Sequence, residues 1–173
     1  MIRWTPFRLL GTVAALACLT ASAAHAVTIT KAIVLDRSIA GVGLGEARAG
    51  IERRIGTGSL VSARTDTSTT PPGHFERVAY SAAGLYVTYA SAGVTPARLA
   101  AAKAVVLETI WTTFRTPQGV HVGSPLSAVR AIPGVRCFAT VCQHGYAGRS
   151  GGTSFLVDPV RKKVVRIVVA YGR

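Results

Sequence analysis

Two stretches of this chain, GVGLGEARAGIERRIG at residues 41–56 and GVHVGSPLSAVRAIPG at residues 119–134, read almost alike. In each, closely spaced glycines are followed by apolar residues at steps of three or four, a spacing typical of one face of a short helix. Gly56 and Gly134 then stand where helices commonly end. Each stretch therefore predicts a glycine turn and a short amphipathic helix. In the second, Ser124 suits the N-cap and Pro125 the first helical position.

Segments that follow the two helices have the character of strands. Apolar and polar residues alternate there, or β-branched residues dominate, and turn residues separate the segments. The predicted strands are 75–81, 84–91, 135–141, 153–158 and 163–171, with 27–35 and roughly 104–114 added. Residues 95–103 begin with a capped, alanine-rich run that favours helix, and their state stays open.

These elements together predict an α+β protein. We expect two tandem units, residues 27–115 and 116–173, each a helix followed by antiparallel strands. The two units would form one shared antiparallel sheet with short helices on one face. The Thr- and Ser-rich segment 57–73, which contains Pro71-Pro72, is expected to be an exposed loop in the first unit.

The two glycine-led stretches resemble the repeated start of the secreted β-lactamase inhibitory protein family and of the related small outer-membrane assembly lipoproteins. The layout is similar over nearly the whole chain after residue 26, and the motif itself over about thirty residues. This resemblance implies a sheet that grips another protein. No individual contact residue is carried over from it.

Residues 1–26 have the pattern of a secretory signal peptide. Arg3 and Arg8 precede a short apolar run, which ends at Ala24-His25-Ala26. The run is too short for a transmembrane helix, which needs about 20 apolar residues. We expect cleavage after Ala26, with lipid attachment at Cys18 as a weaker option. The protein would then be secreted or associated with the cell envelope.

The chain is strongly basic, with 20 Lys and Arg against 7 Asp and Glu and a net charge of +13. Such a charge favours anionic partners, such as an acidic protein or an anionic polymer or lipid of the envelope. Solubility and a biased composition would also produce it. The basic residues are scattered apart from Arg53-Arg54 and Arg161-Lys162-Lys163, so no nucleic-acid partner is expected.

Two cysteines beyond the leader, Cys137 and Cys142, lie close together in RCFATVC. In an exported protein such a pair predicts a structural disulfide at a tight hairpin. A redox pair would more often read C-x-x-C, and a zinc site would need more ligands nearby.

Candidate catalytic motifs are weak. Ser150 lies in GRSGG, which fits G-x-S-x-G, but a strand follows it and no histidine comes later in the chain. The glycines of GVGLG, residues 41–45, lack the spacing of a nucleotide-binding loop. Histidines 74, 121 and 144 lack metal-ligand spacing, and the sequence indicates no convincing partner for any of them. We therefore expect neither catalysis nor a cofactor.

Aromatic residues are the remaining candidates for a site. They could line one face of the sheet and anchor a partner, or pack in the core, which is the commoner role. The four residues are Tyr80, Tyr86, Tyr89 and Trp111. The leading expectation is an exported, non-enzymatic binding protein whose partner is another exported or envelope protein. A basic protein held by charge to anionic envelope polymer or lipid is the alternative, and a small serine hydrolase comes third.

Overall fold

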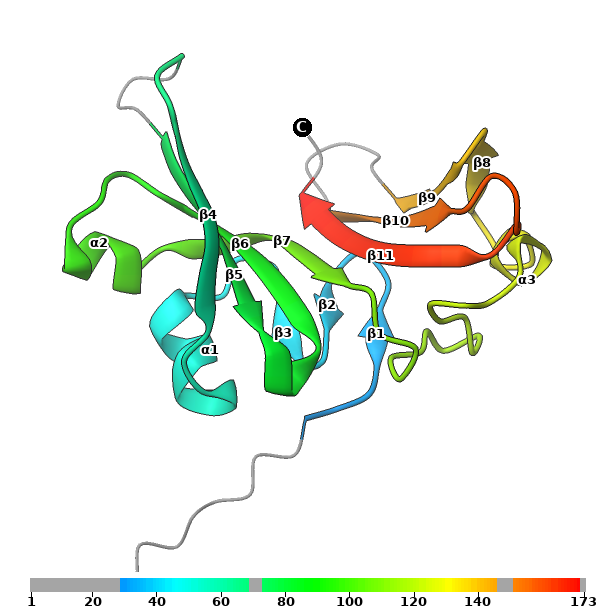
Figure 1. The fold of residues 1–173 in the computed structure, drawn as a ribbon, viewed down its shortest axis with the longest axis horizontal. Coiled ribbons are helices and arrows are strands. Elements are labelled where there is room, and N and C mark those ends of the chain that lie inside the picture. The colour runs from blue at the N-terminus through cyan, green and yellow to red at the C-terminus, as the bar shows by residue number, and fades with distance from the viewer. Residues whose placement is uncertain (1–28, 69–72, 146–150, 172–173) are drawn as a thin grey trace, which may run out of the picture.

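The structure is a computed structural model that describes residues 29–68, 73–145 and 151–171. Its main element is an eight-stranded antiparallel sheet in the order β4-β5-β6-β7-β11-β10-β9-β8 (Figure 1). The chain runs up and down through β4 to β7 and again through β8 to β11, and the two series meet where β7 pairs with β11. The strands are β4 (Ser59–Asp66), β5 (Gly73–Tyr80), β6 (Leu85–Ser91), β7 (Lys103–Thr109), β8 (Arg136–Phe138), β9 (Val141–Gly145), β10 (Gly151–Val157) and β11 (Val164–Tyr171).

One face of this sheet is covered and the other is open. Successive side chains of a strand point to opposite faces, and β5 shows the result clearly. Val78 and Tyr80 are buried, whereas Phe75 and Arg77 are only partly covered. The strand register carries the same division across β6, β7 and β11. We call the less covered side the open face.

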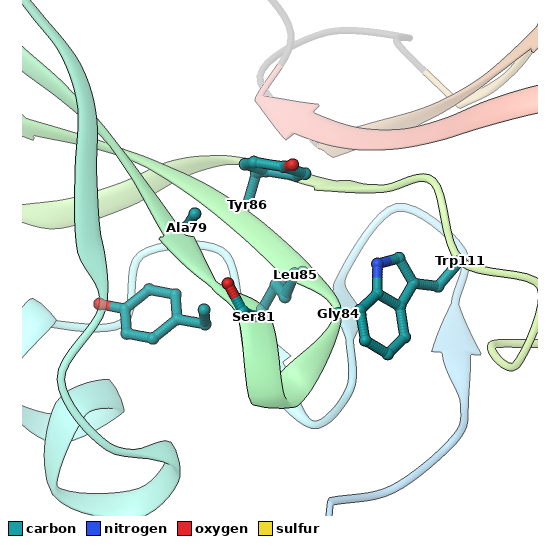
Figure 2. A pocket seen from close by; sticks show the side chains of 7 residues that line it. Ala79, Ser81, Gly84, Leu85, Tyr86 and Trp111 are labelled. Atoms are coloured by element: carbon teal, nitrogen blue, oxygen red, sulfur yellow. The ribbon is translucent and has the colours of Figure 1, made fainter.

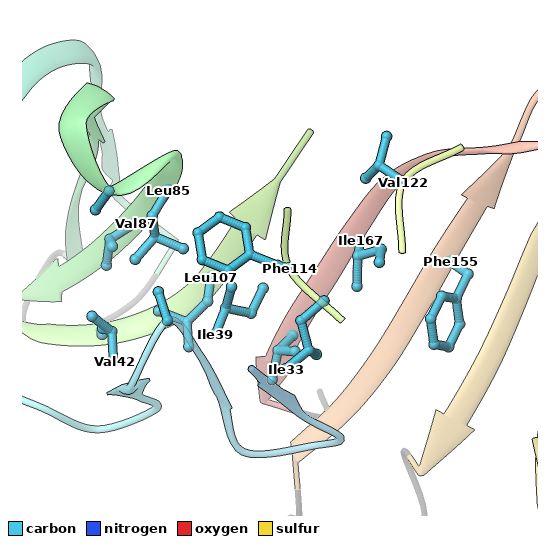
Figure 3. Packing of buried hydrophobic residues seen from close by; sticks show 14 of the residues in the cluster. Ile33, Ile39, Val42, Leu85, Val87, Leu107, Phe114, Val122, Phe155 and Ile167 are labelled. Atoms are coloured by element: carbon cyan, nitrogen blue, oxygen red, sulfur yellow. The ribbon is translucent and has the colours of Figure 1, made fainter. Parts of the chain in front are cut away.

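A small sheet and the first helix lie on the covered side (Figure 1). The small sheet consists of β1 (Ile33–Val34), β2 (Ser38–Ile39) and β3 (Val42–Gly43), and α1 (Arg48–Ile55) follows it. Figure 3 shows the buried side chains of the small sheet meeting those of the large sheet. Each fully buried Ile, Leu or Phe stabilises the fold by about 1.5–3 kcal/mol through removal of apolar surface from water. These contacts join Ile33, Ile39 and Val42 to Val87, Leu107 and Ile167.

Two further helices are short. Pro96–Ala100 forms α2, whose start is capped by the Thr95 hydroxyl, so the open question about 95–103 resolves as helix in its first part. Leu126–Arg130 forms α3, which begins after Pro125 and has no side-chain cap. The expected cap, Ser124, instead accepts a hydrogen bond from the His121 backbone N–H. No helix within the described residues is long and apolar enough to cross a membrane.

The two similar glycine-led stretches make the same backbone contacts. Gly45 donates its N–H to the carbonyl of Ala104 at the start of β7, and Gly123 donates to the carbonyl of Val164 at the start of β11. Both glycines have positive φ, 78° and 98°, which residues with a Cβ rarely adopt. The similarity of the two stretches therefore reflects a shared contact, in which a glycine N–H bonds to a carbonyl at the start of a strand.

The expected fold class is wrong. Strands make up 48% of the described residues and helices only 16%, so the protein is mostly β and is not built from helix-plus-strand tandem units. The amphipathic patterns do form helices, but α3 has only 5 residues and α1 has 8. Burial is supplied mainly by one sheet packing on another, and the helices add little to it.

Several segments also differ from their predicted state. The expected loop 57–73 contains β4, an exposed edge strand, because ladder hydrogen bonds with β5 override its polar, turn-like composition. The expected single strand 135–141 is split by a turn between β8 and β9. No strand contains His121, although Val120 and Val122 beside it are buried. Residues 1–26, the predicted signal peptide, and Ser150 lie outside the described residues.

Candidate functional site

A cluster of charged and aromatic side chains occupies the middle of the open face. The guanidinium of Arg77 on β5 lies over the ring of Tyr86 on β6, 4.4 Å from its centroid. The same guanidinium donates to Glu108 of β7 at 2.7 Å, and Arg166 of β11 approaches that carboxylate at 3.5 Å. These four residues, the central cluster, link the two series of strands across the β7–β11 junction.

The central cluster holds its aromatic ring in a fixed orientation. Glu108 is only 9% exposed, so its charge needs the two arginines that flank it. A cation over an aromatic face contributes about 0.5–1 kcal/mol at an exposed site. Tyr86 therefore lies on the open face of β6, and the Arg77 guanidinium above its ring is held in place by Glu108. Preorganised aromatic surface of this kind loses little conformational entropy on binding.

A depression of about 640 Å³ adjoins the central cluster and is lined from β4, β5, β6, β7 and β11. Arg64 of β4 lies over the ring of Phe75 of β5, 5.0 Å from its centroid. Three strands lie between β4 and β11 in the sheet, yet Arg64 and Tyr171 line the same depression, so the sheet curves around it. We call this the Arg64 depression. Its lining residues are Arg64, Asp66, Phe75, Thr88, Val105, Val106 and Tyr171.

Trp111 lies just beyond β7, against the turn that joins β5 to β6 (Figure 2). Its indole packs so closely on Gly84 that a Cβ there would come within 2.6 Å of the ring. Thr109 fixes this arrangement, because its hydroxyl donates to the Gly84 carbonyl at 2.9 Å and accepts a hydrogen bond from the Trp111 backbone N–H at 3.1 Å. Trp111 is still 44% exposed, so a large aromatic ring is held rigidly at the surface.

Two small cavities are lined in part by Trp111. One, of about 120 Å³, is also lined by Tyr86 and Leu85, and Figure 2 shows Tyr86 on one side of it and Trp111 on another. The second, of about 170 Å³, is lined by Lys31 and Phe114 among others. Each is large enough for an apolar side chain of a partner to enter beside the indole.

The structure brings together two of the four predicted aromatics and separates the other two. Tyr86 and Trp111 share a cavity wall. Tyr80 and Tyr89 are 3% and 1% exposed on the covered face, so the expectation that they present a binding surface is wrong. Tyr86 and Tyr89 are three residues apart on one strand, and an odd spacing places side chains on opposite faces. That signal was present in the sequence.

The two buried tyrosines form a closed pair. Their hydroxyls lie 2.7 Å apart, and the guanidinium of Arg48 lies 5.6 Å from the centre of the Tyr89 ring. Burial, reinforced by the hydrogen bond with Tyr80, holds the pKa of the Tyr89 phenol well above its ordinary value. Both phenols therefore stay neutral, and their role is to fill and satisfy the core.

Sequence reasoning missed a polar network between α1 and β5. Arg48 on α1 donates to Glu52 at 2.8 Å and to Glu76 of β5 at 2.5 Å. His74 lies 3.3 Å from Glu76 on one side and 3.3 Å from the Thr65 hydroxyl on the other. The network lies on the covered face and ties the helix to the sheet. Period-2 alternation in residues 74–80, with Glu76 on the buried side, was the available signal.

His144 also has an acidic partner that the sequence did not reveal. Its Nδ1 lies 2.7 Å from a carboxylate oxygen of Asp36, 108 residues earlier, and the Asp36 backbone N–H donates to Thr153. The second carboxylate oxygen of Asp36 is buried and has no hydrogen-bond partner among the described residues. Ser150 lies outside those residues, so no nucleophile is assigned to the Asp36–His144 pair. The contacts of Asp36 link the β1–β2 turn to β9 and β10.

Two predictions remain, which concern the cysteine pair and metal binding. Cys137 and Cys142 form a disulfide between directly paired positions of β8 and β9, as expected. The described residues contain no group of three or more His, Cys, Asp or Glu that could hold a metal ion.

No protein-family model matches this chain, and no curated protein matches it. Among solved structures, the chain is similar to the crystal structure of the uncharacterized protein yfeY from Escherichia coli. The two share 15% sequence identity with a TM-score of 0.38, over 76% of this chain and 96% of that one. A likeness of this size does not test the resemblance to the inhibitory proteins, which stays a prediction.

Proposed function

We propose that this is an exported, non-enzymatic binding protein that grips another protein with the open face of its large sheet. The observation that carries the proposal is the pair of presented aromatics, Tyr86 and Trp111, which flank one cavity and are each held rigid by neighbouring groups. Residues that dominate binding energy at interfaces are enriched in Trp, Tyr and Arg, and all three types meet here.

Two features support export. Residues 1–26 have the composition of a signal peptide. The disulfide between Cys137 and Cys142 suits an oxidising compartment, where such bonds persist.

Capture of the partner tests the proposal. The tagged protein would be expressed in its own cells, recovered from medium and envelope, and its bound proteins identified by mass spectrometry. Trp111→Ala and Tyr86→Ala should each weaken capture by tenfold or more, because truncation of a central aromatic costs about 2 kcal/mol. The matched control is Val160→Ala, since Val160 is 86% exposed on the turn between β10 and β11. Equal capture by the parent protein and all three variants would refute the proposed binding face.

A second candidate is a basic protein held by charge to anionic polymer or lipid of the envelope. The net charge of +13 favours it, and both basic clusters, Arg53-Arg54 and Arg161-Lys162-Lys163, are exposed. Screening weakens attraction between exposed charges, so stepwise salt extraction should release such a protein. Retention of one stoichiometric protein partner at about 1 M salt, where the Debye length is about 3 Å, would favour the first proposal.

A further inference from the structure

Two arginines on the open face are stacked on aromatic rings, but only one of them forms an ion pair within the described residues. Arg77 over Tyr86 donates to Glu108. Arg64 over Phe75 forms no ion pair with a carboxylate within the part of the chain that the structure describes. When a guanidinium stacks flat on an aromatic ring, its N–H donors lie along its edge and can still bind another group. Arg64 therefore presents a preoriented cation that has no hydrogen bond or ion pair at close range within the described residues, although the charge of Asp66 in the same depression acts on it.

The surroundings of Arg64 define what could bind it. Phe75, Val105 and Val106 supply apolar walls, and Thr88 and Tyr171 complete the lining around Arg64 and Asp66. A guanidinium fork matches the two oxygens of a carboxylate. The depression thus suits a group that has both an apolar body and a carboxylate end.

A densely charged polyanion fits this site poorly. Asp66 lines the same depression, and Arg64 lowers the pKa of its carboxyl after the larger effect of hydrogen bonds from Ser68, so Asp66 carries a negative charge at neutral pH. A second closely spaced anionic group would meet that charge and the apolar walls. A segment in which acidic and apolar side chains alternate would bring a single carboxylate to Arg64, so it would meet less of this repulsion and would place apolar groups on the walls.

We infer that the Arg64 depression anchors an acidic side chain from an extended, alternating acidic and apolar segment of the partner protein. This inference rests on the proposed function and names the chemistry of its partner. The segment would lie across the open face, with one carboxylate on Arg64 and apolar side chains directed toward Trp111. The positive charge of the whole chain favours such a partner and disfavours a second copy of this chain.

Fluorescence anisotropy with a synthetic probe tests the anchor. The probe is a fluorescein-labelled decapeptide of alternating Glu and Val, and its reference is the same peptide with Gln in place of Glu. Arg64→Gln is compared with Arg53→Gln, which removes the same charge from an exposed position on α1, on the covered side. Inorganic polyphosphate serves as the competing polyanion.

We expect the Glu peptide to bind, the Gln peptide to bind more weakly, and Arg64→Gln to weaken binding about fivefold, the effect of about 1 kcal/mol at an exposed charge pair. Arg53→Gln should change it less than twofold. Equal losses in both variants would mean general charge attraction and would overturn the inference. Binding of polyphosphate that depends on Arg64 to the same extent would overturn it in favour of an anionic polymer.

The capture experiment separates this inference from the proposed function. If Trp111→Ala abolishes partner capture while Arg64→Gln leaves both capture and peptide binding unchanged, the binding protein stands and the anchor is wrong. If no partner depends on Trp111 or Tyr86, the proposed function itself fails, whatever the peptide does.

Discussion

Replacing Gly84 by alanine tests whether the turn between β5 and β6 holds Trp111 in its place at the surface. Gly84 has φ 60° and ψ 31°, a left-handed conformation. An added Cβ would lie 2.6, 2.8 and 2.9 Å from three carbons of the Trp111 indole. Carbon atoms in contact prefer about 3.5–4.0 Å, so the ring would have to retreat by roughly 1 Å.

The expected cost has two parts. A left-handed alanine costs about 1–2 kcal/mol, partly offset by about 0.4–1 kcal/mol because alanine restricts the unfolded chain. Overpacking against the indole adds about 1–3 kcal/mol. We therefore expect Gly84→Ala to lower the free energy of unfolding by about 2–4 kcal/mol, and by only about 1 kcal/mol in a Trp111→Ala background, where the steric part is absent.

Urea denaturation followed by far-ultraviolet circular dichroism would measure all four proteins of this cycle. Tryptophan emission gives a second readout, because Trp111 is displaced, and Trp4, the other of the 2 tryptophans, lies in the predicted signal peptide and would be absent from the mature protein. The emission of Gly84→Ala should shift to longer wavelength as the indole gains solvent. Equal destabilisation in both backgrounds, together with unchanged emission, would refute the proposed contact and the rigid presentation of Trp111.

Two other predictions concern ion pairs around α1. Glu76→Ala should lower the free energy of unfolding by about 2–3 kcal/mol in urea denaturation, below the 3–5 kcal/mol typical of a broken buried pair, because Arg48 keeps its bond to Glu52; a loss under 0.5 kcal/mol would contradict the network. Burial raises the pKa of Glu46, but hydrogen bonds from Arg54 and the Gly43 backbone together outweigh it and leave the pKa below 4.5. The ionised carboxylate therefore adds stability above about pH 4.5 that is lost as pH falls through the lowered value. Glu46→Gln should be less stable than the parent by up to about 1 kcal/mol at pH 7, as for exposed ion pairs, and this difference should disappear near pH 3. A stability difference that does not change with pH would contradict a contribution from the ionised Glu46 carboxylate.

Local patterns predicted the strands well where packing agreed with them. Residues 75–81 and 84–91 alternate, and β5 and β6 form there. The segment 57–73 was misjudged because its residues favour turns, and only the neighbouring ladder of β5 makes Ser59–Asp66 a strand. Tyr80 and Tyr89 were assigned to a surface because residue type alone does not indicate which face of a sheet is covered.

The sequence by itself determined the short-range features of this protein: the alternation of its strands, the glycine turns at residues 41–45 and 119–123, and the disulfide between Cys137 and Cys142. Each depends on residues that are near neighbours in the chain. Only the tertiary structure decided which face stayed open, and it alone joined Asp36 to His144 and Arg77 to Glu108. Such contacts depend on strand order and sheet curvature, which follow from the burial of apolar surface over the whole chain.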